Sequence, residues 1–187
     1  MGKLTLLLGG ARSGKSSLAE KMAVESGGEI GYIATARGLD KEMRIRIQRH
    51  RLGRPQSWHT LELPIDVASG WVESGLTPDV VLLDCITLLV TNVILDSSPD
   101  VDHPDEDQAA SAVDREIDAL IKLIESDKSD WIIVTNEVGL GLVPPYPLGR
   151  VYRDLLGRAN QKLAAIADEI FFLVAGIPMP IHQFRAR

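Results

Sequence analysis

The chain has a single cysteine, no long apolar run and no excess of positive charge. One cysteine, Cys85, allows neither an intrachain disulfide nor a cysteine-based metal centre. No apolar stretch approaches the ~20 residues of a membrane-spanning helix, so no membrane span is expected. The net charge of −6 argues against bulk nucleic-acid binding, so no nucleic-acid partner is predicted. The first apolar run is too short for a signal peptide, and a cytoplasmic location is expected.

The chain contains enough hydrophobic residues to form the core of one domain. Its charged residues are unevenly distributed along the sequence. Its 187 residues are 45% hydrophobic, which predicts a single domain over residues 1–187. The segment from Arg37 to Arg54, both included, has seven basic residues and two acids. The segment from Asp96 to Asp130, both included, has twelve acids and three basic residues. A basic segment in an acidic protein fits a polyphosphate ligand, although a solvated helix face gives the same pattern.

The segment Gly9–Ser16, GGARSGKS, follows an apolar run and fills every fixed position of the phosphate-binding pattern G-x-x-x-x-G-K-[ST]. Glycines let successive backbone N–H groups point at phosphate oxygens, and the following helix adds its positive N-terminal dipole. Lys15 is expected to reach the β- and γ-phosphates, and the Ser16 hydroxyl is expected to hold Mg²⁺. The sequence therefore predicts a nucleoside triphosphate site formed by Gly9, Gly10, Ala11, Arg12, Ser13, Gly14, Lys15 and Ser16. The alternative is a glycine-rich turn without a ligand.

Apolar spacing predicts strands that alternate with helices along the chain. Strand-like runs cover residues 4–8, 30–35, 58–63, 79–84, 131–135 and 169–175. Helical spacing covers residues 15–26, 40–52, 64–74, 86–95, 108–125 and 151–167. Asp40 is the expected N-cap of the second helix, and Pro64 is expected in the first turn of the third. Residues 96–107, rich in Asp, Ser and Pro, are predicted to form an exposed loop.

This alternation predicts an α/β fold of the P-loop NTPase class, a RecA-like three-layer arrangement with a largely parallel central sheet. Ligands of such sheets bind at the carboxyl ends of the strands. That rule brings Gly9–Ser16, Thr35, Asp84, Cys85 and Asn136–Glu137 to one edge of the sheet. At that edge Asn136 and Glu137 could orient substrate or Mg²⁺, or could cap their loop with hydrogen bonds.

Two residues outside the loop carry candidate chemistry. Asp84 ends an apolar strand, where a carboxylate would hold Mg²⁺ together with Ser16; the alternative is an N-cap for the next helix. His50 lies in the basic helix, four residues after Arg46 and so on the same face. Nearby positive charge favours the neutral imidazole, which can attack phosphorus while arginines neutralise the displaced phosphates. The alternative is a surface histidine or a simple phosphate contact.

Several blocks, in one order, give the chain a resemblance to a known family. The blocks are GGARSGKS (9–16), YIATA (32–36), DKEMRIRIQRHRLGRPQSWHTLE (40–62), LLDCITLLVTN (82–92), VTNEVGLGLVP (134–144) and YRDLLGRANQKLA (152–164). The P-loop alone is generic, but the strings HRxxRPxxW, DCxTxxVTN and NEVGxGxVP together are specific. The chain resembles the bifunctional adenosylcobinamide kinase/adenosylcobinamide-phosphate guanylyltransferases of cobalamin synthesis.

The resemblance implies two reactions with ATP or GTP as substrates. The family phosphorylates adenosylcobinamide and then transfers GMP from GTP onto that phosphate, with GMP carried on a histidine that matches His50. With the Mg²⁺ predicted from the P-loop as cofactor, it implies a corrinoid as partner molecule and a homo-oligomer, a trimer. It also implies that Lys15 and His50 are catalytic, and that GTP contacts extend beyond the P-loop to Ala34, Thr35, Ala36, Arg51, Leu52, Gly53, Arg54, Glu62 and Asp84.

Two other functions compete with this interpretation. The first is a P-loop kinase of another small molecule, in which the basic helix only clamps phosphate and no covalent intermediate forms. The second is a RecA-like NTPase or regulator that acts on a macromolecule; the absence of aromatic residues among the arginines argues against nucleic acid there. Trp58 is equally consistent with a core residue and with a platform for a nucleotide base.

Overall fold

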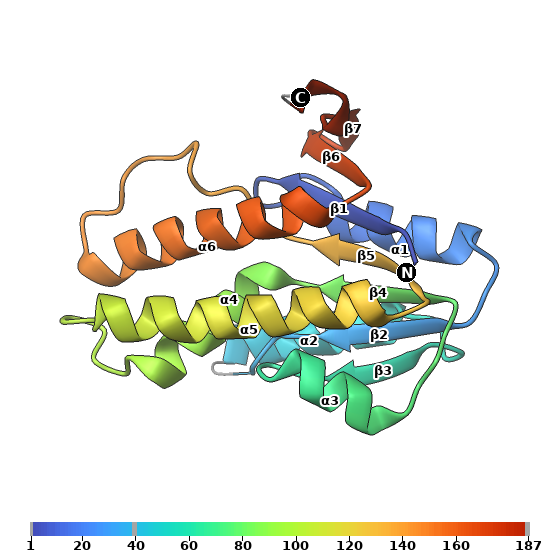
Figure 1. Cartoon of the computed structure of the whole chain (residues 1–187), viewed down its shortest axis with the longest axis horizontal. Helices are drawn as coiled ribbons and strands as arrows, with labels where there is room; N and C mark the ends of the chain where they lie inside the picture. The colour runs from blue at the N-terminus through green and yellow to red at the C-terminus, as the bar shows by residue number, and fades with distance from the viewer. Residues whose placement is uncertain (1, 39–40, 186–187) are drawn as a thin grey trace.

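The computed structural model describes residues 2–38 and 41–185, and it does not describe the side chains of Glu42, Met43, Arg46, Arg49 and His50. Its centre is a seven-stranded sheet of order β3-β2-β4-β5-β1-β6-β7 (Figure 1). Neighbouring strands pair in parallel except β6 and β7, which are antiparallel. The strands are β1 (Leu4–Gly9), β2 (Ile30–Ala34), β3 (His59–Glu62), β4 (Val80–Asp84), β5 (Asp130–Val134), β6 (Glu169–Val174) and β7 (Ile177–Pro180).

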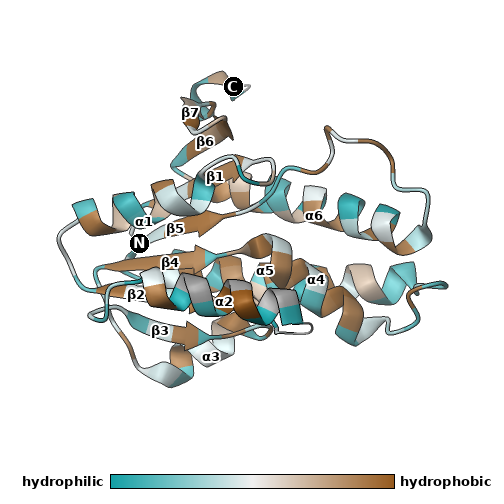
Figure 2. Ribbon diagram, turned by 180° about the vertical axis from the view of Figure 1, so that it is seen from behind, coloured by the Kyte–Doolittle hydropathy of each residue, from teal (hydrophilic) through white to brown (hydrophobic). Residues whose placement is uncertain are grey.

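Helices cover both faces of this sheet. They are α1 (Lys15–Glu25), α2 (Lys41–Gly53), α3 (Val67–Ser74), α4 (Ile86–Ser97), α5 (Glu106–Ser126) and α6 (Pro147–Ile166), with a short 3-10 helix η1 (His182–Phe184) near the end. Helices α3 to α6 pack on one face, and α1 packs on the other, against β1, β4 and β5 (Figures 1 and 2). Within the described residues no helix is both long and apolar enough to cross a membrane.

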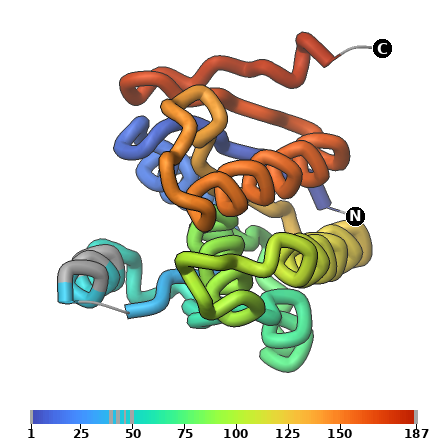
Figure 3. The backbone as a smooth tube through the Cα atoms, turned by 90° about the vertical axis from the view of Figure 1, so that its left-hand side faces the viewer, coloured from blue at the N-terminus to red at the C-terminus, as the bar shows by residue number. Residues whose placement is uncertain are grey.

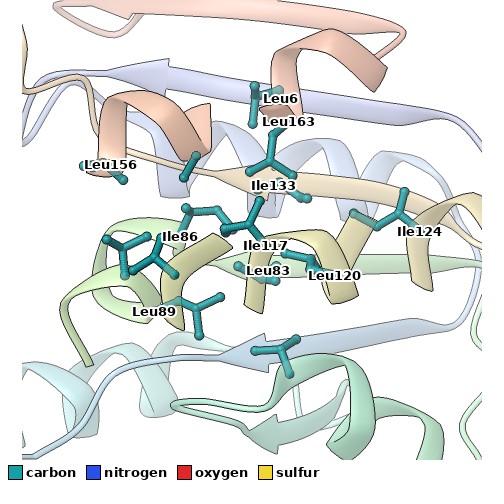
Figure 4. Packing of buried hydrophobic residues seen from close by; sticks show 14 of the residues in the cluster. Leu6, Leu83, Ile86, Leu89, Ile117, Leu120, Ile124, Ile133, Leu156 and Leu163 are labelled. Atoms are coloured by element: carbon teal, nitrogen blue, oxygen red, sulfur yellow. The ribbon is translucent and has the colours of Figure 1, made fainter. Parts of the chain in front are cut away.

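The core consists of two apolar clusters separated by the sheet. The larger one joins β1, β4 and β5 to helices α3 to α6. Leu83 and Ile133 of the strands face Ile117 and Leu120 of α5, and Leu6 of β1 lies beside Leu163 of α6 (Figure 4). The smaller one joins the other face of the strands to Ala19 and Ala23 of α1. Each buried aliphatic side chain of this kind stabilises the fold by about 1.5–3 kcal/mol relative to an exposed one.

The predicted RecA-like three-layer P-loop fold is confirmed. Strand β1 leads into the P-loop, Gly9–Ser16, and strand β4 ends at Asp84. In the sheet, β5 lies between these two strands. All six predicted strands and all six predicted helices are present, with ends shifted by a few residues. The predicted N-cap at Asp40 lies outside the described residues.

Three boundaries differ from the prediction for identifiable reasons. The third helix begins at Val67 rather than Pro64, because Asp66 has a left-handed backbone (φ 51°) and Glu116 caps the helix start by accepting from the N–H groups of Asp66 and Val67. The acidic loop is shorter than 96–107, because α4 continues to Ser97 and Asp105 caps α5 by accepting from the Gln108 N–H. The sixth helix begins four residues early, at Pro147, where a proline costs no hydrogen bond.

The antiparallel strand β7 was not expected. Its sequence contains Pro178 and Pro180, which suppress a strand prediction because proline lacks an N–H. At the edge of a sheet this loss is tolerated, and β7 is the edge strand next to β6. The tail beyond it packs back on α6: the guanidinium of Arg185 donates to the carbonyl of Ala167 at 2.7 Å, at the negative end of that helix.

One buried side chain fastens α4 to two loops, and its removal gives a stability prediction. The Asn92 amide donates to the carbonyls of Thr35 (2.8 Å) and Pro64 (2.9 Å), and Asn92 is only 3% exposed. Asn92→Ala leaves both carbonyls without that partner, so we expect the free energy of unfolding to fall by about 3 kcal/mol in urea titrations. Ser97→Ala removes a bond within α4 itself and should change it by less than about 0.5 kcal/mol. Equal losses in the two variants would contradict this role.

Candidate functional site

The loop Gly9–Ser16 has the backbone geometry of an anion-binding turn. Gly9 and Gly14 have φ of 154° and 97°. A Cβ on Gly9 would lie 2.5 Å from the Leu173 carbonyl oxygen, so this position requires glycine. Gly14 is the N-cap of α1, whose first N–H groups have no partner within the helix. Gly10, Ala11 and Arg12 are exposed at the tip, whereas Ser13 is buried at the base.

Lys15 lies inside this loop. Its ammonium donates to the Gly10 carbonyl at 2.7 Å and to the Ser13 hydroxyl at 3.4 Å, and the residue is 5% exposed. Burial lowers the pKa of Lys15, and the nearby Asp84 carboxylate partly opposes that shift. The loop thus holds a buried cation beside a row of backbone N–H groups, which is the arrangement that binds phosphate.

A cavity beside the loop collects six of the predicted residues from five segments of the chain. Ser16, Ala34, Ala36, Arg54, Glu62 and Asp84 line it, together with Tyr32, Ile47, Cys85 and Leu88. Ser16 of α1 and Asp84 of β4 therefore line one cavity, as predicted from the rule that ligands bind at the carboxyl ends of parallel strands. A larger cavity of about 600 Å³ lies between α3, α4 and α5, and none of the predicted site residues whose side chains the structure describes lines it.

Asp84 faces this cavity rather than capping the next helix. The N-cap of α4 is Cys85, without a side-chain hydrogen bond, and one Asp84 oxygen, Oδ2, accepts from the Tyr32 hydroxyl at 3.2 Å. Burial, followed by the Asp84 charge, raises the pKa of Tyr32, so its hydroxyl stays protonated as a donor. The same two causes raise the pKa of the Cys85 thiol to about 12. At neutral pH the thiol is therefore uncharged.

Arg54 is held over an aromatic ring with part of its guanidinium unpaired. Its Cζ lies 3.6 Å from the centre of the Tyr32 ring, in cation–π contact. Its Nε is buried and has no hydrogen-bond partner among the described residues. A buried donor without a partner costs free energy, and a phosphate oxygen in the cavity would satisfy it.

The other predicted residues of the basic segment lie at the end of α2. Arg51 forms an ion pair with Glu62 of β3, and both side chains are about half exposed. Leu52 is 80% exposed, and Gly53 ends the helix. Neither Arg51, Leu52 nor Gly53 lines the cavity. His50 falls within α2, but its side chain lies outside the described residues; Figure 3 shows this helix at the side of the main body.

Three further predicted residues make structural hydrogen bonds at the same edge. The buried Thr35 hydroxyl donates to the Cys85 carbonyl at 2.7 Å and accepts from the Cys85 N–H at 2.8 Å, which ties β2 to β4. The N–H of Glu137 donates to the Gly9 carbonyl, and its carboxylate accepts from Gly139 N–H at 2.5 Å. The N–H of Asn136 donates to the Thr87 hydroxyl at 2.8 Å. These bonds fit the loop-capping interpretation of Asn136 and Glu137.

Comparison with known proteins identifies the family. The family model described as "Cobinamide kinase / cobinamide phosphate guanyltransferase" matches residues 5–181. The chain belongs to this family. The matched range contains every predicted site residue, from Gly9 to Asp84.

Curated members of the cobinamide kinase/guanyltransferase family align over almost the whole chain. The Bifunctional adenosylcobalamin biosynthesis protein CobU is 42% identical in Escherichia coli (strain K12) and 43% in Salmonella typhimurium, each covering 95% of this chain and 99% of the relative. CobP of Pseudomonas aeruginosa is 42% identical over 94% of this chain and 95% of its own.

Two solved proteins found by comparison of structures have much lower sequence identity to the chain. The flagellar accessory protein FlaH from Methanocaldococcus jannaschii is 16% identical, with a TM-score of 0.43, covering 95% of this chain and 75% of that one. The RadB recombinase is 15% identical, with a TM-score of 0.48, covering 91% and 74%.

Sequence reasoning missed one residue of the cavity that makes two polar contacts. Tyr32 belongs to the block YIATA, but it lies in an apolar strand, where the sequence pattern does not distinguish it from an ordinary core residue. Trp58, left open between core and platform, is 8% exposed and stacks on Tyr32 with the ring centres 6.0 Å apart. The structure supports the core interpretation of Trp58.

Proposed function

We propose that this chain catalyses both reactions of its family: phosphorylation of adenosylcobinamide with ATP or GTP, and transfer of GMP from GTP onto the new phosphate. The observation that carries the proposal is the cavity beside the P-loop. It combines Ser16, Asp84 and the Nε of Arg54, which has no hydrogen-bond partner within the described part of the chain. Oxygen ligands for a cation and a donor for phosphate therefore face one space.

In the kinase step, the P-loop N–H groups and Lys15 hold the β- and γ-phosphates. Ser16 and Asp84 would hold Mg²⁺, because a hydroxyl and a carboxylate beside a phosphate site suit its preference for oxygen ligands. The bound Mg²⁺ supplies positive charge that neutralises the phosphate oxygens. The substrate hydroxyl attacks the γ-phosphorus and loses its proton, and the nucleoside diphosphate leaves.

In the guanylyl step, the imidazole of His50 attacks the α-phosphorus of GTP, and pyrophosphate leaves. A phosphate oxygen of the phosphorylated corrinoid then attacks the same phosphorus, breaks the P–N bond and restores the imidazole. Support comes from the end of α2: Arg54 reaches the cavity and Arg51 pairs with Glu62, which lines it. The C-terminal end of the helix containing His50 is therefore fastened beside the nucleotide site.

The assembly and location of the protein also belong to this proposal. The family resemblance supports a homo-oligomer, a trimer, that works in the cytoplasm on small-molecule substrates. Sedimentation equilibrium of the purified chain tests the trimer: a mass of three chains is expected, and a concentration-independent monomer would contradict it.

The proposed function is tested by supplying the substrates in sequence. The chain with Mg²⁺, ATP and adenosylcobinamide should give the phosphorylated corrinoid, and later addition of GTP should give its GDP derivative with release of pyrophosphate, both identified by mass. Phosphorylation without GMP transfer would favour a simple kinase. Nucleotide hydrolysis without a corrinoid product, stimulated by DNA in a salt-sensitive way, would favour the regulator.

A further inference from the structure

Tyr32 lies at the junction of two parts of the candidate site. It occupies the middle of β2, beside Leu82 of β4 and Thr60 of β3, and is 1% exposed. Its hydroxyl donates to Oδ2 of Asp84 at 3.2 Å, and its ring carries the guanidinium of Arg54 at 3.6 Å. One buried side chain therefore contacts both the carboxylate assigned to the metal and the arginine assigned to phosphate.

The surroundings fix this side chain in place. The Trp58 ring stacks on the Tyr32 ring at an interplanar angle of 27°, and Arg54 contacts the ring as a cation–π partner. A buried hydroxyl needs a partner, and the Asp84 carboxylate provides one. Since only Oδ2 accepts from Tyr32 in the bonds described, the second oxygen is left for a ligand in the cavity.

We propose that Tyr32 is a positioning residue: its hydroxyl orients Asp84 toward Mg²⁺, and its ring holds Arg54 toward the nucleotide phosphates. This inference rests on the proposed function. It also assigns separate roles to two parts of one side chain, the hydroxyl to the metal and the ring to the arginine. Partners that orient a metal-binding carboxylate change metal affinity when removed, by roughly 10–100-fold.

The test separates the hydroxyl from the ring. Tyr32→Phe removes only the hydroxyl, whereas Tyr32→Leu removes both contacts. Tyr152→Phe is the matched control, because it removes the hydroxyl of another tyrosine with a largely buried side chain, which lines a different cavity. The readouts are the Mg²⁺ concentration for half-maximal binding of a fluorescent GTP analogue, the rate of covalent labelling by GTP at saturating Mg²⁺, and the thermal midpoint.

For Tyr32→Phe we expect the half-maximal Mg²⁺ concentration to rise about 10-fold, with covalent labelling at saturating Mg²⁺ preserved. For Tyr32→Leu we expect the same rise and, in addition, labelling slowed about 10-fold. Tyr152→Phe should change neither quantity. A Tyr32→Phe variant with wild-type Mg²⁺ dependence would overturn the metal role, and wild-type labelling by a folded Tyr32→Leu variant would overturn the arginine role.

The measurements distinguish failure of the role proposed for Tyr32 from failure of the proposed function. If wild type binds the GTP analogue with Mg²⁺ but never becomes labelled, the guanylyl step fails while the Mg²⁺ arm of the test still decides the role of the hydroxyl. If wild type is labelled and Tyr32→Phe matches it at every Mg²⁺ concentration, the function stands and the inference falls.

Discussion

The His50→Asn variant is expected to keep the kinase step and to lose guanylyl transfer by at least about 10⁴-fold. A nucleophile that forms the covalent intermediate has no substitute, because asparagine carries no basic nitrogen to attack phosphorus. The proposed kinase step uses the P-loop, Lys15 and the pair Ser16 and Asp84, and none of these residues belongs to α2. The measurement is the yield of phosphorylated corrinoid and of its GDP derivative from the same incubation.

The control is His59→Asn, which removes an exposed histidine from β3 by the same chemical change. It should leave both products at wild-type levels. If His50→Asn still forms the GDP derivative at more than a few per cent of the wild-type rate, His50 is not the nucleophile. If the His50→Asn variant forms neither product, His50 is needed for both reactions and not specifically for the transfer step.

The Lys15→Ala variant is expected to lose both reactions, each by about 10³-fold. Lys15 is the buried cation of the loop proposed to hold the phosphates of ATP and of GTP, and removing one charged donor to a reacting phosphate costs about 3–4 kcal/mol. Initial rates with each nucleotide measure the effect. The shared loss distinguishes this variant from His50→Asn, which affects one reaction only.

Lys21→Ala is the control for Lys15→Ala. Lys21 lies on the exposed side of the same helix and forms a surface ion pair with Glu25, so its removal should change neither rate. A Lys15→Ala enzyme that keeps one reaction at the wild-type rate would mean that the two reactions use different phosphate sites. The proposed single nucleotide site would then be wrong.

The fold was largely predictable because its strands and helices have distinct apolar patterns. The continuous runs of β4 and β5 are buried on both faces of the sheet, as parallel strands between helices require. The spacing of apolar residues could not predict β7. Its two prolines are tolerated only in an edge strand, and the position of a strand in the sheet cannot be determined from its own residues. It also could not predict the start of α3, which depends on Glu116, 49 residues away in the chain.

The candidate site was predictable where a contiguous motif or a strand end marks it. The P-loop and Asp84 are of this kind, and both line or border the cavity. Tyr32 was not predictable in this way, because its partners Asp84 and Arg54 lie 52 and 22 residues away and meet it only through strand pairing and the return of α2 to β3. The role of His50 came from the family resemblance, since a lone histidine in a basic helix has several possible uses.

The guanylyl-histidine mechanism is tested most directly by covalent labelling of the protein with GTP labelled on the α-phosphate, in the presence of Mg²⁺. We expect label that survives denaturation, is lost in acid and kept in alkali, as a phosphoramidate is, and maps to the peptide containing His50. No label under conditions where GTP demonstrably binds, or label on another residue, would contradict the covalent mechanism.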